Sequence, residues 1–277
     1  MSVEVAAQVL GEGPPVVLLH GFTGSALAWG DVASRLARRR RVIAFDLPGH
    51  GAAPIPHDPE EARLPDVASA LVRALAALGV EAADWVGYSL GARTALQVAV
   101  TQPEAVRALV LESGSPGIAD SLERAARAEA DARLADAIER DGLERFVDAW
   151  LAQPLFASQA HLPPDVRARE RARRLGGRTS GYAFSLRAMG TGTQQPLWER
   201  LAGVRIRTLL LAGALDVKYC ALAHAMAAAL PDARVAIVRG AGHAVHLERP
   251  DAWLDEVEPF LDGVRAHAQA RAAVLSA

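Results

Sequence analysis

Short, continuous apolar runs alternate with longer amphipathic segments along the first 114 residues. Apolar runs with no polar alternation are typical of strands in a parallel sheet that is buried on both faces. The regular change from one type of segment to the other predicts a doubly wound α/β arrangement. We expect strands at residues 3–8, 16–19, 42–45, 84–86 and 108–111, and helices at residues 29–38, 65–78 and 90–100.

This alternation stops between residues 115 and 195, where no strong strand pattern is present. Charged helical segments replace it, and proline and glycine pairs separate them. Strand–helix alternation then resumes to the C-terminus. We therefore expect a core built from residues 1–114 and 196–277, with residues 115–195 inserted as a helical cap. The expected elements are cap helices at 121–140, 143–151 and 164–175, later strands at 208–212 and 234–238, and later helices at 219–230 and 252–267.

The pentapeptide Gly87-Tyr88-Ser89-Leu90-Gly91 lies between an expected strand and an expected helix. A serine flanked by glycines at this junction is typical of the nucleophile elbow, a tight turn that projects the serine hydroxyl clear of the sheet. Side chains at the two glycine positions would collide with the neighbouring strand and helix. The N-terminus of the following helix stabilises negative charge beside the serine. The motif therefore predicts that Ser89 is a reactive hydroxyl.

Two further residues complete a catalytic triad with Ser89. Asp216 and His243 each follow an expected strand, so they belong to the same edge of the sheet as the serine. The chain order Ser, Asp, His is that of the α/β-hydrolase fold. Backbone N–H groups of Phe22 and Leu90 would form an oxyanion hole. We therefore predict an α/β-hydrolase fold, with a mostly parallel, doubly wound sheet and the inserted helical cap.

Composition narrows the function classes. The 277 residues are 51% hydrophobic, enough for one large core, and the net charge is −2 with a pI of about 6.5. This balance provides no general attraction to nucleic acid or to an anionic membrane. We see neither a signal peptide nor an apolar stretch long enough to span a bilayer, and expect a cytoplasmic location. The histidines show no metal-ligand spacing, and we interpret His20 and His50 as structural. The oligomeric state stays open.

An arginine close to the serine suggests the charge of the substrate. Arg93 comes four residues after Ser89, one helical turn along the same face. A guanidinium buried beside a reactive serine is costly unless it meets an anion, and its planar fork matches a carboxylate. We therefore expect a small anionic substrate. Lys218 is the only lysine among 30 basic residues, which we interpret as a compositional bias.

The cap carries motifs that general hydrolases lack. With them, the chain resembles the 2-succinyl-6-hydroxy-2,4-cyclohexadiene-1-carboxylate synthase (MenH) family from His20 to beyond His243. The motifs are His20-Gly21-Phe22-Thr23-Gly24-Ser25, Ser115-Pro116-Gly117-Ile118, Glu123-Arg124-Ala125-Ala126-Arg127, Trp150 with Gln153-Pro154-Leu155-Phe156-Ala157-Ser158, the segment 185–192 and Leu197-Trp198.

This resemblance implies a lyase that needs no metal or organic cofactor. The family's substrate is a cyclohexene that bears a succinyl group, a ring carboxylate and an enolpyruvyl ether. A ring proton is removed, pyruvate leaves and the ring becomes a diene. Three carboxylates on the substrate would be bound by arginines, which by motif position are Arg93, Arg127 and Arg174. Tyr88 and Trp150 would line the pocket.

The resemblance also implies roles for the triad. Ser89, activated by His243 and oriented by Asp216, would act as the base rather than as an acylating nucleophile. The N–H groups of Phe22 and Leu90 would stabilise the negative charge that develops on the succinyl ketone oxygen.

Two other functions remain open from the sequence. A serine hydrolase of a small carboxylate-bearing ester, thioester or C–C substrate would use the same triad but form an acyl-enzyme at Ser89. A binding or signalling module could keep the fold without catalysis, and would bind its ligand even after Ser89→Ala. Acylation of Ser89 separates the hydrolase from the lyase, and the absence of any turnover marks the module.

Overall fold

The computed structural model describes the backbone of residues 3–275 and the side chains of residues 3–263. Residues 1–2 and 276–277, at the two ends of the predicted core, lie outside the described residues. In the described part of the chain, seven strands form one sheet in the order β1-β3-β2-β4-β5-β6-β7. The strands are β1 (Ala6–Leu10), β2 (Pro15–Leu19), β3 (Arg41–Asp46), β4 (Ala83–Tyr88), β5 (Val106–Glu112), β6 (Thr208–Gly213) and β7 (Ala233–Val238).

The sheet is parallel except at one edge. β2 to β7 pair in parallel, whereas β1 pairs antiparallel with β3. The central strands are apolar on both faces because helices cover both, and residues 16–19 of β2 are fully buried. At the edge, Val9 and Leu10 of β1 are more than 40% exposed. The predicted fold class is confirmed. The first strand lies two to three residues later than its apolar pattern predicts.

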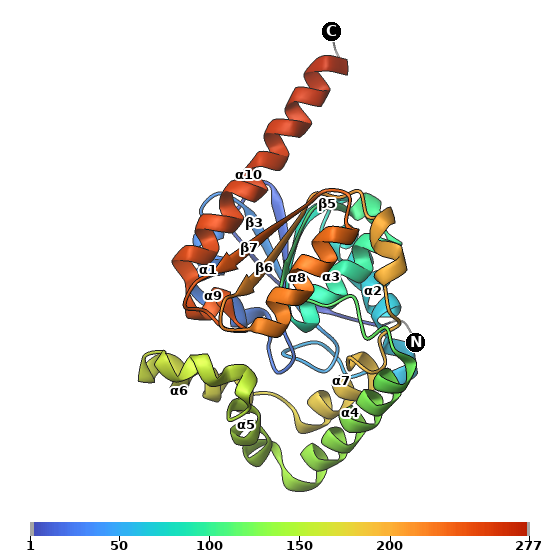
Figure 1. Ribbon diagram of the computed structural model, residues 1–277, viewed down its shortest axis with the longest axis vertical. Coiled ribbons are helices and arrows are strands. Elements are labelled where there is room, and N and C mark those ends of the chain that lie inside the picture. Colours follow the sequence, from blue (N-terminus) through green and yellow to red (C-terminus); the bar gives the residue numbers. More distant parts are fainter. Residues whose placement is uncertain (1–2, 276–277) are drawn as a thin grey trace.

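Helices pack on the two faces of the sheet (Figure 1). One buried cluster joins one face to α2, α3 and α8, and a second joins the opposite face to α1 and α10. These helices are α1 (Gly30–Leu36), α2 (Leu64–Ala77), α3 (Leu90–Thr101), α8 (Val217–Ala229) and α10 (Pro250–Leu275), with the short α9 (Val245–Glu248) before the last. Short 3-10 turns are η1 (Ala26–Trp29), η2 (Pro59–Ala62), η3 (Pro103–Ala105) and η5 (Trp198–Gly203). No helix in the described range is long and apolar enough to cross a membrane.

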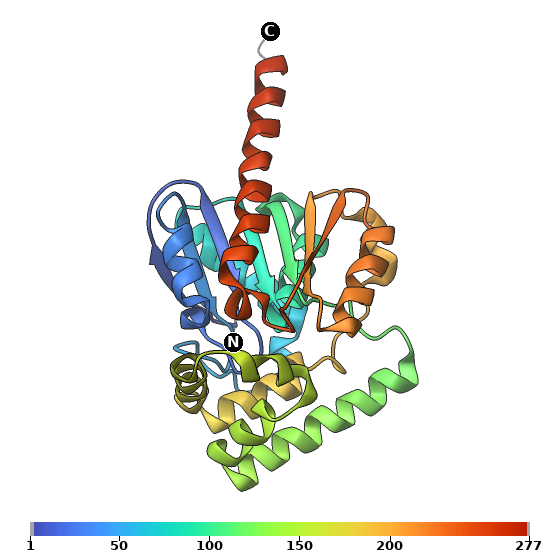
Figure 2. The same ribbon diagram turned by 60° about the vertical axis from the view of Figure 1, so that its left-hand side comes forward.

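The chain between β5 and β6 is helical and adds no strand to the sheet. They lie against the end of the core opposite to the C-terminal tip of α10 (Figures 1 and 2). Helices close to the three predicted are present, while α7 was missed by the sequence pattern. The exact division of the chain at residues 115 and 195 stays a prediction. The elements are α4 (Ser121–Asp141), α5 (Leu143–Leu151), η4 (Pro154–His161), α6 (Pro164–Leu175) and α7 (Thr179–Met189).

The helix α7 connects this cap to the core. Tyr182 of α7 is buried in a cluster with α4 and α5, and its hydroxyl donates to the carbonyl of Thr23 at 3.2 Å. Arg63 of the core donates from Nη1 to the carbonyl of Arg187, at 2.6 Å. A β-carbon built on Gly181 would lie 2.0 Å from the carbonyl oxygen of Gly49, in the loop after β3. The backbone of the cap at Gly181 is therefore in direct contact with the backbone of the core at Gly49.

Gly181→Ala tests this contact. The added methyl meets a backbone atom that has little freedom to move, so we expect a loss of about 1–3 kcal/mol in the free energy of unfolding, as in other overpacked sites. We also expect lower activity, because the cap must shift. Urea unfolding and turnover measure the two effects. Gly203→Ala is the matched control, since its added β-carbon meets nothing within 4 Å; equal behaviour of the two variants would contradict the tight contact.

Candidate active site

Ser89 occupies a strained turn between β4 and α3. Its φ of 54° lies in the left-handed region, which non-glycine residues rarely adopt. A β-carbon on Gly87 would lie 2.3 Å from the carbonyl oxygen of Gly91, and one on Gly91 would lie 2.0 Å from that of Leu19. Glycine is therefore required on both sides of the serine. The physical basis of the predicted elbow is confirmed by this geometry.

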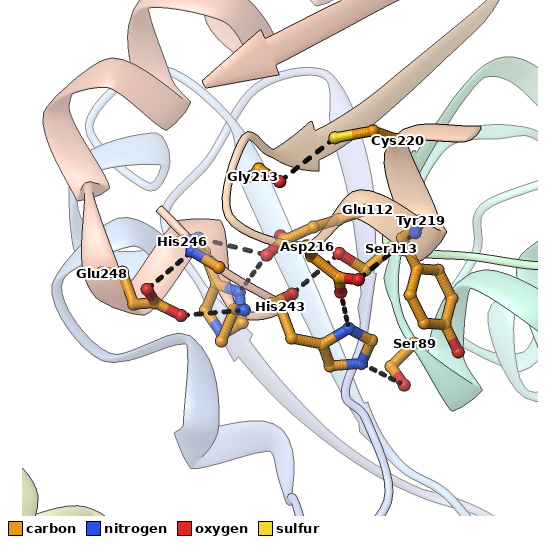
Figure 3. A network of polar contacts seen from close by, with 12 residues as sticks. Ser89, Glu112, Ser113, Gly213, Asp216, Tyr219, Cys220, His243, His246 and Glu248 are labelled. Atoms are coloured by element: carbon orange, nitrogen blue, oxygen red, sulfur yellow. Dashed lines mark hydrogen bonds and ion pairs between the residues drawn. The ribbon is translucent and has the colours of Figure 1, made fainter. Parts of the chain in front are cut away.

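The structure brings Ser89, His243 and Asp216 into one hydrogen-bonded chain (Figure 3). Nε2 of His243 lies 3.1 Å from Oγ of Ser89, and its Nδ1 lies 2.7 Å from Oδ2 of Asp216. The other carboxylate oxygen of Asp216 accepts the backbone N–H of Tyr219 at 3.3 Å, at the start of α8. His243 is 1% exposed. Asp216 thus holds the histidine with its other ring nitrogen directed at the hydroxyl of Ser89.

A cavity of about 880 Å³ opens above this chain of residues, between the core and the cap. Both Phe22 and Leu90 line it beside Ser89. Leu90 is the first residue of α3, and the first N–H groups of a helix have no acceptor within the helix. The residues predicted to supply the oxyanion hole therefore face the same space as the serine.

Tyr88 and Trp150 also line this cavity, as the sequence predicts. The ring of Trp150 packs edge-to-face on Phe22, with centroids 5.2 Å apart. Burial, followed by the negative charge of Glu112, raises the pKa of the Tyr88 phenol well above its usual value. Tyr88 is therefore neutral near pH 7 and can donate a hydrogen bond.

Arg93 is the most deeply placed cation of the cavity. It is 8% exposed, and its guanidinium donates to Oε1 of Gln194 at 3.0 Å and to the carbonyl of Met189 at 2.9 Å. Both acceptors are neutral. Burial lowers the pKa of Arg93 to about 10, so the side chain is still charged near pH 7. Among the described residues, the hydrogen bonds of this buried positive charge go only to neutral groups, and the Asp131 carboxylate acts on it without a hydrogen bond.

The other two predicted arginines differ from each other in position. Arg127 lines the cavity, and its Nε donates to the buried carboxylate of Asp131 at 2.7 Å. Arg174 is buried too, but it is not among the residues that line the cavity with Ser89. Its Nη1 donates to the carboxylate of Glu170 at 2.7 Å. A role for Arg174 in substrate binding stays a prediction.

Two polar residues that sequence reasoning missed also line the cavity, at the start of α8. Lys218 and Tyr219 both line it, and the Lys218 ammonium lies 5.8 Å from the Tyr219 ring. The Tyr219 ring lies 4.6 Å from that of His243, measured between centroids. Their position directly after Asp216 was the available signal, because residues that follow the triad acid belong to the same edge of the sheet.

His20 and His50 are buried, do not line the cavity, and contact each other with ring centroids 4.9 Å apart. Nε2 of His20 accepts the backbone N–H of Leu47 at 3.1 Å, while its Nδ1 lies 2.8 Å from the carbonyl of Gly21. Only the neutral ring, protonated at Nδ1, satisfies both contacts.

Within the described residues, no group of three His, Cys, Asp or Glu side chains could hold a metal ion.

The chain is similar to known proteins over nearly its whole length. Residues 14–250 match the model of the alpha/beta hydrolase fold. A candidate 2-succinyl-6-hydroxy-2,4-cyclohexadiene-1-carboxylate synthase of Bacillus subtilis (strain 168) is 41% identical, with 92% of this chain and 94% of the relative covered. The solved structure of MenH from S. aureus superposes with a TM-score of 0.89 at 30% identity, covering 95% and 99% of the two chains. A malate-bound thermophilic esterase of Thermogutta terrifontis has a TM-score of 0.84 at 25% identity, covering 95% and 94%.

The buried histidines predict a dependence of stability on pH. Burial lowers the pKa of His20 to about 4 and that of His50 well below 6.5. Between these values and 6.5 the unfolded chain binds more protons than the folded one, so stability falls as the pH falls from 6.5 toward 4. Each histidine contributes a slope of about 1.4 kcal/mol per pH unit.

Urea unfolding between pH 7.5 and 5 measures this slope. The range stops above the ordinary pKa of carboxylates, which would otherwise contribute. His20→Gln should reduce the slope, whereas a substitution of the exposed His57 should leave it unchanged. A wild-type slope near zero would show that these rings are protonated without cost.

Proposed function

Because the chain belongs to the 2-succinyl-6-hydroxy-2,4-cyclohexadiene-1-carboxylate synthase family of the α/β-hydrolase fold, we propose that it eliminates pyruvate from 2-succinyl-5-enolpyruvyl-6-hydroxy-3-cyclohexene-1-carboxylate. The product is the 2,4-cyclohexadiene of the family name, an intermediate of menaquinone biosynthesis. This reaction needs a base, a way to stabilise an enolate, and cations for a substrate with three carboxylates. The cavity contains candidates for each.

Arg93 is the observation that carries the proposal. A buried guanidinium that meets only an amide oxygen and a peptide carbonyl keeps much of its desolvation cost. A substrate carboxylate would offset that cost with a charge-assisted hydrogen bond, which is worth roughly 1.5–3 kcal/mol. Arg127 and Lys218 line the same cavity and would bind the other carboxylates.

Ser89 and His243 would carry out the proton transfer. The proton at C2 of the ring is acidic because it is α to the succinyl ketone and allylic to the ring double bond. Ser89 Oγ takes this proton while its own proton passes to Nε2 of His243, 3.1 Å away. The freed electron pair forms the C2–C3 double bond, the ring double bond moves to C4–C5, and the C5–O bond breaks. The departing enolate takes up a proton and becomes pyruvate.

The N–H groups of Phe22 and Leu90 would stabilise the ketone oxygen as charge develops on it. Preorganised donors of this kind contribute about 2.7–4 kcal/mol each in enzymes that have been dissected by mutation. Asp216 would stabilise the imidazolium of His243 without taking the proton itself. These roles make the serine a base that stays free of covalent attachment.

A serine hydrolase of a small carboxylate-bearing substrate is the second candidate. The same contact between Ser89 and His243 would activate the hydroxyl for attack on an acyl carbon. The structural likeness to the malate-bound esterase supports this alternative. The two candidates differ in one observable property, because only the hydrolase passes through an acyl-enzyme at Ser89.

The decisive measurement is a coupled assay in which the preceding pathway enzyme generates the enolpyruvyl cyclohexene in place. We expect the diene absorbance and pyruvate to appear in equal amounts, with a loss of at least about 1,000-fold in Ser89→Ala. Mass spectrometry of the enzyme during turnover should find no acyl adduct. No diene, together with turnover of aryl esters and an adduct on Ser89, would establish the hydrolase instead.

Arg93→Met tests the anion-binding role. Removing the guanidinium should lower kcat/KM by roughly 10- to 150-fold, the equivalent of about 1.5–3 kcal/mol. Stability should change little, because the side chain in the free enzyme meets only neutral acceptors. Steady-state kinetics and thermal unfolding report the two quantities. Arg133→Met on the exposed face of α4 is the control. Unchanged kcat/KM in Arg93→Met would remove the basis of the proposal.

Lys218→Met should raise KM a few-fold and leave kcat nearly unchanged, because Lys218 is exposed at the cavity wall and such charges contribute about 1 kcal/mol or less. The effect should shrink in high salt, and Lys218→Arg should restore the wild-type KM. If KM were independent of the charge at this position, Lys218 would have no part in binding.

A further inference from the structure

Two buried carboxylates lie behind the catalytic histidine and belong to no part of the triad. Glu112, at the end of β5, is fully buried, and Glu248, at the end of α9, is 8% exposed. Figure 3 shows both beside the segment that carries His243. Neither forms an ion pair with an arginine or lysine in the described part of the chain. Buried carboxylates are expensive unless hydrogen bonds satisfy them, so their contacts indicate what they do.

Glu248 accepts the backbone N–H groups on both sides of His243. Its Oε2 lies 2.7 Å from the nitrogen of Gly242, and its Oε1 lies 3.2 Å from that of Ala244. One carboxylate thus holds the N–H groups of the residues before and after the catalytic residue, which belong to the peptides 241–242 and 243–244. Because the side chain of a residue follows its backbone, this contact restricts where the imidazole can lie.

The carbonyl of His243 is held as well. Oγ of Ser113 donates to it at 2.8 Å. Ser113 follows β5 directly, and its own N–H bonds to the carbonyl of Leu211 in β6. The hydroxyl is therefore anchored to two adjacent strands of the sheet. Together with Glu248, it fixes the peptide groups of residues 242–244 at three points.

Glu112 anchors the segment that follows. Its Oε1 accepts the backbone N–H and the ring Nδ1 of His246, at 3.2 and 2.8 Å, and its Oε2 accepts the indole N–H of Trp253 at 2.8 Å. These contacts attach α9 and the start of α10 to the end of β5. Glu248 is the last residue of α9, so Glu112 also fixes the helix from which Glu248 reaches back.

A second catalytic pair of Glu112 and His246 is a competing interpretation. The His246 ring is packed between Trp29 and Tyr88, with centroid distances of 4.6 and 4.7 Å. It is absent from the residues that line the cavity with Ser89. This pair therefore has no access to substrate, and its contacts favour a structural anchor.

We propose that Glu248 is a positioning residue for His243, with Ser113 holding the other side of the same peptide. The carboxylate matches two N–H donors at once, which a carboxamide cannot do because its NH₂ group would face one of them. The proposal rests on the proposed function only in taking His243 as the group that receives the serine proton. A small displacement of that ring would weaken its contacts with both Ser89 and Asp216.

Glu248→Gln is the test. We expect kcat to fall about 10- to 100-fold with KM within about twofold of wild type, since misplacement of a catalytic group by about 1 Å has effects of this size. The proton between His243 Nδ1 and Asp216 should give a low-field ¹H NMR resonance in the wild type, which Asp216→Asn would identify. In Glu248→Gln this resonance should move upfield or broaden. An unchanged resonance with unchanged kcat would overturn the proposal.

Ser113→Ala and Glu256→Gln complete the design. Ser113→Ala removes one hydrogen bond with little change in volume. It therefore keeps the test valid even if Glu248→Gln folds poorly. We expect it to shift the same resonance and to lower kcat severalfold. Glu256→Gln, a partly exposed residue of α10 that pairs with Arg234, should change neither.

The resonance is measured without substrate, so its outcome is independent of the reaction. Absence of diene formation in the wild type would overturn the proposed function. An unaltered resonance in both Glu248→Gln and Ser113→Ala would overturn the positioning role alone.

Discussion

The contact between α3 and the end of β2 is the constraint on which the site depends. Gly91 lies so close to the carbonyl of Leu19 that no side chain fits between them. This approach places the N-terminus of α3 beside the loop after β2, and so brings Leu90 and Phe22 to the same cavity. Ser89 lies in the strained turn that this packing requires. Strain of this kind persists only where the surrounding structure over-determines it.

Two charged side chains of the site, Arg93 and Asp216, are buried, and so they are largely shielded from water. Arg93 is buried among neutral acceptors, whereas Asp216 is bonded to His243 and to a backbone N–H. In a medium of low dielectric constant, each of these charges interacts more strongly with another charge than it would in water. The cap makes this environment possible by covering the edge of the sheet, and α7 holds the cap there.

Most of the core and the triad could be predicted because their signals are local. Buried parallel strands have continuous apolar sequences, and the elbow has a fixed spacing of glycine around serine. The helix α7 escaped prediction because its segment contains glycine, serine and threonine, whose helical state depends on packing against α4. Arg174 and Lys218 illustrate the limit for side chains. Arg174 finds Glu170 within its own helix, while Lys218 reaches the cavity only because α8 begins at the triad acid.

The sequence by itself determined the fold class, the serine in the strained turn and the two residues that form a hydrogen-bonded chain with it, since strand order and turn chemistry leave few alternatives for them. The tertiary structure decided which cations face the cavity and what holds the histidine. Glu248 and His243 are five residues apart, and nothing in their spacing indicates that the carboxylate of Glu248 accepts the backbone N–H groups of both neighbours of His243. Such contacts depend on how a loop, a short helix and the end of β5 meet in space, and that meeting is fixed by the packing of the whole sheet.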